Sequence, residues 1–557
     1  MPTTTFAPAT DLADRLLADR AVSRIWARDI SVWGAAPGSA EARSISTRLG
    51  WLDVGRTMAS EIERVARLAH EARQERVQAV YLLGMGGSSL CAEVLRSVFG
   101  VAEGHPELVV LDTTDELTIT TAAARMDPAR TWFIVASKSG GTVEVASLER
   151  YFRARVSTAV RTPPGRQFVA ITDPGTSLQQ LATTQGYREV FLNPADIGGR
   201  FSALSLFGLV PAALIGSAPD ELLAAGRAMA EGCRQENHAN AGLELGAFIG
   251  AAALSGRDKL TLVLPPSLSA LGLWIEQLIA ESTGKHGKGA LPVVDETLGR
   301  PDEYGSDRVF VAMATDRDEP DSRRLDALED AGFPVLKLST RIDALGSEFF
   351  RWEFATAVAG AALAINPFDE PNVSEAKEKT KALLVAFRSQ GRLPEPAFTA
   401  ASSDLGVWTP AFAGASPEAL IKGALASLSA GDYVAFLSYL PGLAAVEAAI
   451  GNIRQALRAR YQVASTFGVG PRYLHSTGQY HKGGPNTALA FVLTSDDTTS
   501  TDIPDAGYSF SVLKRAQALG DTEALTAHGR RVVRLHLKGI VEDAGAALER
   551  AFTEALS

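Results

Sequence analysis

The sequence is poor in cysteine, and its net charge is negative. Its 557 residues include only two cysteines, Cys91 and Cys233, too few for a disulfide framework or a four-cysteine zinc site. A formal net charge of −10 argues against a general nucleic-acid-binding protein. The chain has no basic leader followed by an apolar core, and no apolar run long enough to cross a membrane. These absences predict a cytoplasmic protein that binds neither nucleic acid nor a membrane.

Short apolar runs alternate with helical patterns along most of the chain. The strand candidates are residues 77–84, 108–113, 132–137, 167–172, 188–193, 259–265, 308–315, 334–339, 432–440, 488–495 and 530–537. Continuous Val/Ile/Leu runs with helices between them predict parallel sheets covered on both faces. A chain of this length should divide into about three domains.

The predicted fold class is therefore α/β. We expect two doubly wound parallel-sheet domains, residues 77–217 and 218–390, and a smaller C-terminal α/β domain, residues 405–557. A helical segment rich in Ala, Arg, Glu and Leu, residues 1–76, precedes them. The stretch 389–406, with its Pro and Ser residues, is the best candidate for a linker.

Glycine- and serine-rich turns follow three strands of the first domain, where parallel sheets bind ligands. The first, YLLGMGGSSL, places Gly87 and Ser88 before a helix whose N-terminus can hold an anion. An alternative is a degenerate dinucleotide fingerprint with Asp112 as the ribose partner, although Ser89 replaces its third glycine.

The second turn, ASKSGGTVEV, is dense in small polar groups. Ser137, Ser139 and Thr142 supply hydroxyl groups, and Lys138 supplies a positive charge. Hydroxyl and amide groups at the start of a helix can hold a phosphate monoester. The alternative is a capped helix with Glu144 in its first turn.

Two further stretches point to charge-stabilising and acid–base chemistry. In PADIGGRFSALS, Arg200 could stabilise a negative oxygen at a strand end, or form a structural pair with Asp196. In WIEQLIAESTGKHGKG, Glu281 falls in the last turn of a helix, where the dipole should raise its pKa. Such a carboxylate suits proton abstraction next to a carbonyl. The alternative is a solvent-facing Glu281 capped by Lys285.

Together these motifs resemble the sugar-isomerase domains of the phosphoglucose isomerase family. GMGGSSL, SKSGGT and DIGGRFSALS occur in the family's order and spacing, and ESTGK is similar to its ESxGK motif. The resemblance covers roughly residues 77–390. It is closest to bacterial isomerases fused behind a transaldolase, of which this chain would be a stand-alone version. In AINPFDEPNVSEAK, Lys377 resembles the lysine of the family's closing helix. The alternative is that Lys377 is one of several solvated helix lysines, with Lys379 and Lys381 beside it. Glu370 replaces a usual Gln and should repel an anionic ligand.

One family element is displaced along the chain. The family carries a histidine that helps to open the sugar ring between its glutamate and its closing lysine. Here the nearest match in that interval is IDALGSEFFRW, with Asp343 in the histidine's place, and His286 is the only histidine there. The pattern reappears as HSTGQYHKGG, which gives His475 the ring-opening role; His286 is the alternative. His475 and His481 lie near each other in sequence, but no Cys, Asp or Glu cluster joins them to form a metal site.

The resemblance implies an aldose–ketose isomerase that interconverts glucose 6-phosphate and fructose 6-phosphate through a cis-enediol, in glycolysis and gluconeogenesis. It implies no cofactor and no metal, and a homodimer whose histidine comes from the neighbouring subunit, unless the added domain supplies it. The implied catalytic residues are Glu281, Lys377, His475 and Arg200. The implied substrate-binding residues are Gly87, Ser88, Ser137, Lys138, Ser139 and Thr142.

Three alternatives remain open from the sequence. The first is an isomerase of another anionic hexose, such as mannose 6-phosphate or a sulfonated sugar. The second is a sugar-phosphate-binding regulator without catalysis, which would need neither Glu281 nor Lys377. The third is a nicotinamide enzyme, which would leave ESTGK unexplained.

Overall fold

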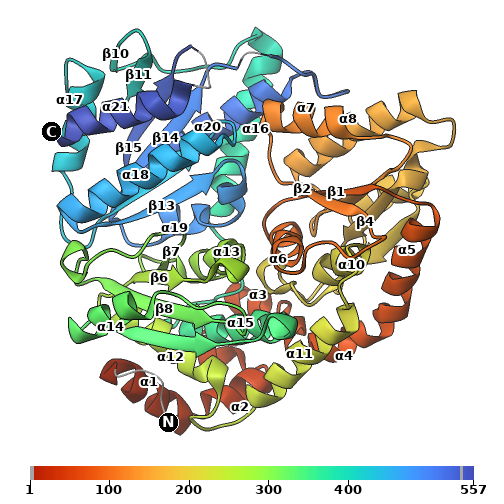
Figure 1. Ribbon diagram of the computed structural model, residues 1–557, viewed down its shortest axis with the longest axis horizontal. Helices are drawn as coiled ribbons and strands as arrows, with labels where there is room; N and C mark the ends of the chain where they lie inside the picture. The colour runs from red at the N-terminus through yellow and green to blue at the C-terminus, as the bar shows by residue number, and fades with distance from the viewer. Residues whose placement is uncertain (1–5, 498, 540–542) are drawn as a thin grey trace.

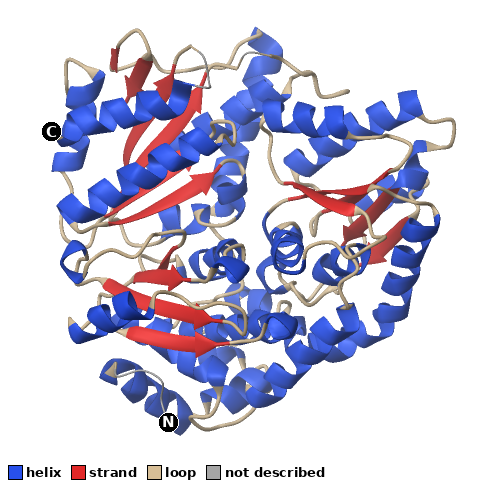
Figure 2. Cartoon of the chain, in the orientation of Figure 1, coloured by secondary structure: helices blue, strands red, loops and turns tan. Residues whose placement is uncertain are grey.

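Three sheets, each flanked by helices, make up the computed structural model, which describes residues 6–497, 499–539 and 543–557 (Figures 1 and 2). The first sheet has the strand order β2-β1-β3-β4-β5, and all its neighbouring strands are parallel. Its strands are β1 (Ala79–Gly84), β2 (Glu107–Leu111), β3 (Thr131–Ala136), β4 (Phe168–Thr172) and β5 (Glu189–Leu192). The order reverses between β1 and β3, so the GMGGSS and SKSGGT turns flank the point where such sheets bind ligands.

The second sheet is also parallel, with the order β7-β6-β8-β9. Its strands are β6 (Lys259–Val263), β7 (Leu291–Val293), β8 (Arg308–Ala314) and β9 (Val335–Ser339). Strand β7 is absent from the sequence prediction, because three residues that include a proline give no strand pattern.

The third sheet has the order β10-β11-β15-β14-β12-β13. Four strands are parallel: β12 (Tyr433–Ser438), β13 (Ala464–Val469), β14 (Ala488–Ser495) and β15 (Arg531–Leu537). The antiparallel edge consists of β10 (Ala400–Ala401) and β11 (Leu405–Trp408). This sheet has more strands than the second one, although the sequence predicted that the C-terminal α/β domain would be the smaller one. Strand β10 lies inside the predicted linker, residues 389–406.

Helices cover both faces of the sheets. Those of the N-terminal segment are α1 (Ala7–Ala18), α2 (Ala21–Trp26), α3 (Ala40–Ser46), α4 (Val54–Thr57) and α5 (Ile62–Gln74). Those that follow strands of the first sheet are α6 (Leu90–Phe99), α7 (Glu116–Arg125), α8 (Val143–Ala159), α9 (Ser177–Thr184) and α10 (Leu206–Leu214). Then come α11 (Pro219–Gly232), α12 (Ala241–Leu254), α13 (Leu271–Thr283), α14 (Ser322–Asp330), α15 (Leu345–Leu363) and α16 (Val373–Gln390). The last are α17 (Pro417–Ala426), α18 (Ala444–Tyr461), α19 (Gly478–Gly483), α20 (Phe510–Ala527) and α21 (Ala544–Leu556).

The two faces of the first sheet belong to different hydrophobic cores. Alternate residues of β1, such as Val80 and Leu82, pack with α5, α6 and α10, while Tyr81 and Leu83 pack with α7 and α8. The second of these cores also contains apolar residues of α16 and α20. Elements from the second and third parts of the chain therefore cover the α7 and α8 side of the first sheet (Figure 1). Within the described residues, no helix is long and apolar enough to cross a membrane.

Candidate active site

The glycine turn after β1 forms the contact point of three chain segments. A Cβ atom on Gly87 would lie 2.1 Å from the carbonyl oxygen of Gly199, in the turn that carries Arg200. Gly86 has a φ of +55°, and a Cβ there would lie 2.7 Å from the carbonyl oxygen of His475. Only glycine permits both approaches. The turn therefore packs on the backbone of two further segments, the one that carries Arg200 and the one that carries His475.

Glu281 lies in the last turn of α13 and is only 5% exposed. Its Oε1 is 3.2 Å from Nη1 of Arg200, and its Oε2 accepts a hydrogen bond of 3.1 Å from Nε2 of Gln277. Burial raises the pKa of Glu281, although the positive charge of Arg200 opposes the rise. The direction agrees with the sequence prediction, but the main cause is burial. The alternative of a solvent-facing Glu281 capped by Lys285 is wrong, since Lys285 is buried against Asp369.

Arg200 is buried and held by several acceptors. Its Nε donates to Oγ of Ser282 at 3.0 Å, and its Nη2 donates to two backbone carbonyls of segment 367–369, at 3.2 and 3.0 Å. Its Nη1 donates to Oε2 of Glu370 at 3.1 Å. These contacts of Arg200 do not include Asp196, so the structural Asp196–Arg200 pair, the alternative from the sequence, is not found. Instead, the guanidinium group lies between the two carboxylates of Glu281 and Glu370.

His475 ends a 3-10 turn between β13 and α19, and its contacts reach the other two sheets. Its Nε2 is 3.0 Å from Oε1 of Glu144, in the first turn of α8. Its carbonyl oxygen accepts a hydrogen bond of 2.7 Å from Nε2 of Gln277, the same nitrogen that donates to Glu281. The structure therefore brings the displaced histidine motif to Glu281 within a single chain. His286, by contrast, is exposed in the turn after α13.

Glu144 is a site residue that the sequence presented only as a helix-capping group. Burial alone would raise its pKa, but His475, through its hydrogen bond and through its charge when protonated, and the positive charge of Lys377 lower it overall. The sequence signal that could have identified Glu144 was its position two residues after Thr142, directly after the predicted phosphate-binding turn.

A cavity of about 350 Å³ joins the predicted phosphate turn to the histidine. Ser139, Thr142, Glu144, Lys377 and His475 all line it. Its other lining residues include apolar side chains of α16. Glu281 and Arg200 are not among the lining residues, although Gln277 connects Glu281 to His475.

The remaining predicted binding residues, Gly87, Ser88, Ser137 and Lys138, are not among the residues that line this cavity. Oγ of Ser137 is buried and lies 3.0 Å from Oγ1 of Thr142. Lys138 instead forms an ion pair with Asp173, and its Nζ donates to the carbonyl oxygen of Ala195 at 3.2 Å. Lys377 is exposed on α16, and no ion pair to it occurs in the part of the chain that the structure describes.

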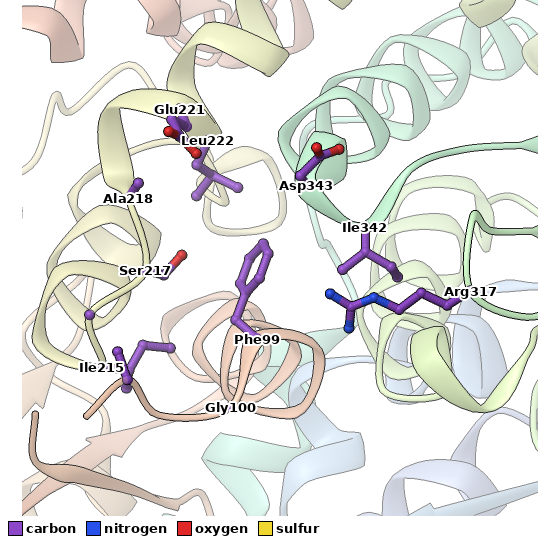
Figure 3. A pocket seen from close by; sticks show the side chains of 12 residues that line it. Phe99, Gly100, Ile215, Ser217, Ala218, Glu221, Leu222, Arg317, Ile342 and Asp343 are labelled. Atoms are coloured by element: carbon purple, nitrogen blue, oxygen red, sulfur yellow. The ribbon is translucent and has the colours of Figure 1, made fainter.

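A second hollow, of about 310 Å³, lies elsewhere (Figure 3). Phe99, Leu222 and Ile342 form its apolar wall, and Arg317 and Asp343 approach it from one side. Asp343, which stands in the expected place of the family's histidine, pairs there with Arg341. None of the predicted site residues lines this hollow.

Nothing in the described ranges forms a group of three or more His, Cys, Asp or Glu side chains that could hold a metal ion. His481 is buried, with its Nδ1 2.8 Å from the hydroxyl group of Tyr433. Burial lowers the pKa of His481 to about 3, so the ring is neutral and serves as a packing group of the loop.

Comparisons with known proteins identify relatives that match part of the chain. A family model described as phosphoglucose isomerase matches residues 53–299. The glucose-6-phosphate isomerase of Carboxydothermus hydrogenoformans is 28% identical over an alignment of 399 residues, and the match covers 60% of this chain and 85% of the relative. That of Rubrobacter xylanophilus is 27% identical over 394 residues, 60% of this chain and 89% of the relative. A solved glucose-6-phosphate isomerase from Chlamydia trachomatis matches with a TM-score of 0.50 and 20% identity, over 66% of this chain and 78% of that chain, and so shows a similar fold.

Proposed function

We propose that this chain, a member of the phosphoglucose isomerase family, interconverts glucose 6-phosphate and fructose 6-phosphate, a reaction of glycolysis and gluconeogenesis. The observation that carries the proposal is the linked arrangement of Glu281, Arg200 and His475. A buried carboxylate touches a buried guanidinium group, and Gln277 bonds both that carboxylate and the histidine loop.

Glu281 is the proposed base for the isomerisation step. In the open-chain sugar it removes the proton from C2, and the C1–C2 double bond of a cis-enediolate forms with the negative charge on O1. The hydroxyl proton of O2 passes to O1, the same carboxyl group returns its proton to C1, and the C2 carbonyl group of the ketose forms. Because burial raises the pKa of Glu281, its carboxylate is a stronger base than an exposed one. Arg200 lies close enough to stabilise the negative oxygen of the enediolate.

Ring opening is assigned to His475 and Lys377, one acting at the ring oxygen and the other at the C1 hydroxyl group. Both residues line the cavity of about 350 Å³. Glu144 orients the histidine, because its carboxylate accepts the hydrogen bond from Nε2.

The proposed phosphate site lies at the other side of the same cavity. The hydroxyl groups of Ser137, Ser139 and Thr142, with the amide groups at the start of α8, are the suitable donors. Lys138 and the Gly87–Ser88 turn are proposed as nearby contacts. The ion pair of Lys138 with Asp173 leaves most of the phosphate binding to neutral donors.

Glu370 need not repel the substrate as strongly as the sequence suggested. Its carboxylate accepts from Arg200 at 3.1 Å and lies 3.9 Å from Arg48. Burial alone would raise the pKa of Glu370, but the positive charges of Arg200 and Arg48 lower it overall. Within the site, its negative charge is thus balanced by neighbours.

A homodimer stays a proposal that rests on the resemblance. The proposed ring-opening histidine does not require a second copy, since His475 reaches Glu144 and Gln277 of its own chain.

The test is a coupled assay of fructose 6-phosphate conversion to glucose 6-phosphate. Glu281→Gln removes the base and should lower kcat by about a thousandfold, within the range for general acid–base catalysis. Glu276→Gln, the same substitution five residues earlier on α13, is the matched control and should retain activity. An inactive wild-type protein would refute the assignment to this reaction, and a fully active Glu281→Gln would refute the base.

A further inference from the structure

Helix α20, which follows β14 of the third sheet, contacts the start of helix α7 beside the first sheet through regularly spaced polar side chains. Oγ of Ser511 bonds to Glu116, and Nζ of Lys514 lies 3.0 Å from Oδ2 of Asp115. Three residues further along, Gln517 occupies the same helix face. Figure 1 shows α20 and α16 beside α7 and α8, where these contacts occur.

Gln517 connects two buried groups of the first sheet. Its Oε1 accepts a hydrogen bond of 2.8 Å from Oγ1 of Thr114, and its Nε2 donates to Oε1 of Glu144 at 2.7 Å. All three side chains are at least 96% buried. Because an ionised carboxylate only accepts hydrogen bonds, the amide nitrogen must face Glu144 and the amide oxygen must face Thr114.

The oxygen of Glu144 that accepts from Gln517 is also the one that faces His475. Oε1 of Glu144 lies 3.0 Å from Nε2 of the histidine. A neutral His475 must therefore carry its proton on Nε2 to make this bond. Its Nδ1 has no hydrogen-bond partner in the described part of the chain, so this is the nitrogen left for the substrate.

We propose that Gln517 is a positioning residue for ring opening: anchored by Thr114, its amide group holds Oε1 of Glu144 against Nε2 of His475, which keeps the histidine ring in the tautomer with the proton on Nε2. The third sheet thus supplies both the histidine and the helix that orients its partner. This inference rests on the proposed function, because it assigns ring opening to His475.

Ring opening is measured separately from proton transfer by starting from Glu281→Gln. Opening and reclosing the ring interconverts the two anomers of glucose 6-phosphate without needing the base, and exchange NMR follows this rate. Adding Gln517→Met, which keeps the side-chain length but makes no hydrogen bond, should slow the enzyme's anomer exchange about tenfold, the factor that one hydrogen bond to a charged group carries. Adding Ser511→Ala instead removes a contact on the same helix face that does not reach Glu144, and the exchange rate should stay at the parent value.

The tautomer supplies a readout that a merely structural role would not change. Nitrogen NMR of histidine-labelled protein, with the signal assigned by its loss in His475→Asn, should show a single Nε2-protonated form in the wild type. Gln517→Met should give a mixture of tautomers. Thr114→Val, at the far end of the connection, should give the same kind of change to a smaller extent, and it serves if the Gln517 variant does not fold.

Equal exchange rates in the Gln517→Met and Ser511→Ala proteins would overturn the proposal, as would a wild-type His475 protonated on Nδ1. These failures differ from failure of the proposed function. If the wild type converts neither hexose phosphate, the tautomer measurement still decides whether Gln517 orients the histidine.

Discussion

Glu276 carries a buried carboxyl group that plays no part in the proposed chemistry, and its titration should control stability. It lies five residues before Glu281 on α13, is 5% exposed, and has no hydrogen-bond partner for Oε1 in the described ranges. Burial raises its pKa to about 8, and the negative charge of Asp295 adds to the rise, while Arg472 and Arg454 oppose it. The folded protein therefore keeps this group neutral at neutral pH.

The consequence is a loss of stability as the pH rises. The unfolded chain releases this proton near the ordinary value of 4.5, whereas the folded chain retains it up to about pH 8. Between these values the unfolded state binds fewer protons, so the free energy of unfolding falls by about 1.4 kcal/mol per pH unit. Integrated from pH 5 to pH 8, the group costs about 3 kcal/mol. Glu276→Gln removes this cost, and its stability relative to the wild type should rise by that amount over the same range.

Urea unfolding followed by tryptophan fluorescence measures the difference directly. Trp274 is buried two residues before Glu276 and reports on the same helix. Glu447→Gln, at an exposed position on α18, is the control, and its stability relative to the wild type should not change with pH. A pH-independent difference between wild type and Glu276→Gln would show that the folded protein holds this carboxylate ionised, and would refute the burial argument.

Two further predictions concern ion pairs in the site and in its supporting loop. Glu370→Gln removes a negative charge that raises the pKa of Glu281, so the pKa of Glu281 should fall. The acidic limb of kcat/KM plotted against pH should then move to lower pH. An unmoved limb would show that the two carboxylates do not interact through Arg200. Lys482 pairs with Asp521 at 2.7 Å, and both side chains are buried. Lys482→Met leaves that carboxylate unpaired and should cost about 3–5 kcal/mol in urea unfolding, whereas a double variant that also carries Asp521→Asn should recover most of the loss. Equal losses in the two proteins would contradict the pairing.

The strand pattern was predictable where large apolar residues mark a buried parallel strand. Strands β1, β3 and β4 are runs of Val, Ile, Leu, Phe and Ala between polar turns, and the sequence locates them within a residue or two. Strand β13 reads Ala-Ser-Thr-Phe-Gly-Val and escapes this criterion. It forms because it pairs in parallel with β12, which is a long-range contact that local sequence does not encode.

The candidate site likewise contains residues that the sequence could identify and residues that it could not. Glu281 and Arg200 stand in motifs whose residue types already suggest acid–base and charge-stabilising chemistry. Gln277 and Gln517 do not, because a glutamine on a helix is an ordinary surface residue until another segment packs on it. Each of them binds a group far away in the chain: Gln277 bonds the carbonyl oxygen of His475, and Gln517 bonds Glu144.

The position of His475 explains why the histidine motif can lie so far along the sequence. Its loop is fixed on one side by its own sheet, through the buried contacts of His481 with Tyr433 and of Lys482 with Asp521. On the other side, the backbone at His475 packs on Gly86 and accepts a hydrogen bond from the amide group of Gln277. A ring-opening group needs a fixed distance to the base and not a fixed distance in sequence. A third sheet docked against the first two therefore places His475 where the proposed ring-opening group is needed, whereas Asp343 lies at a separate hollow.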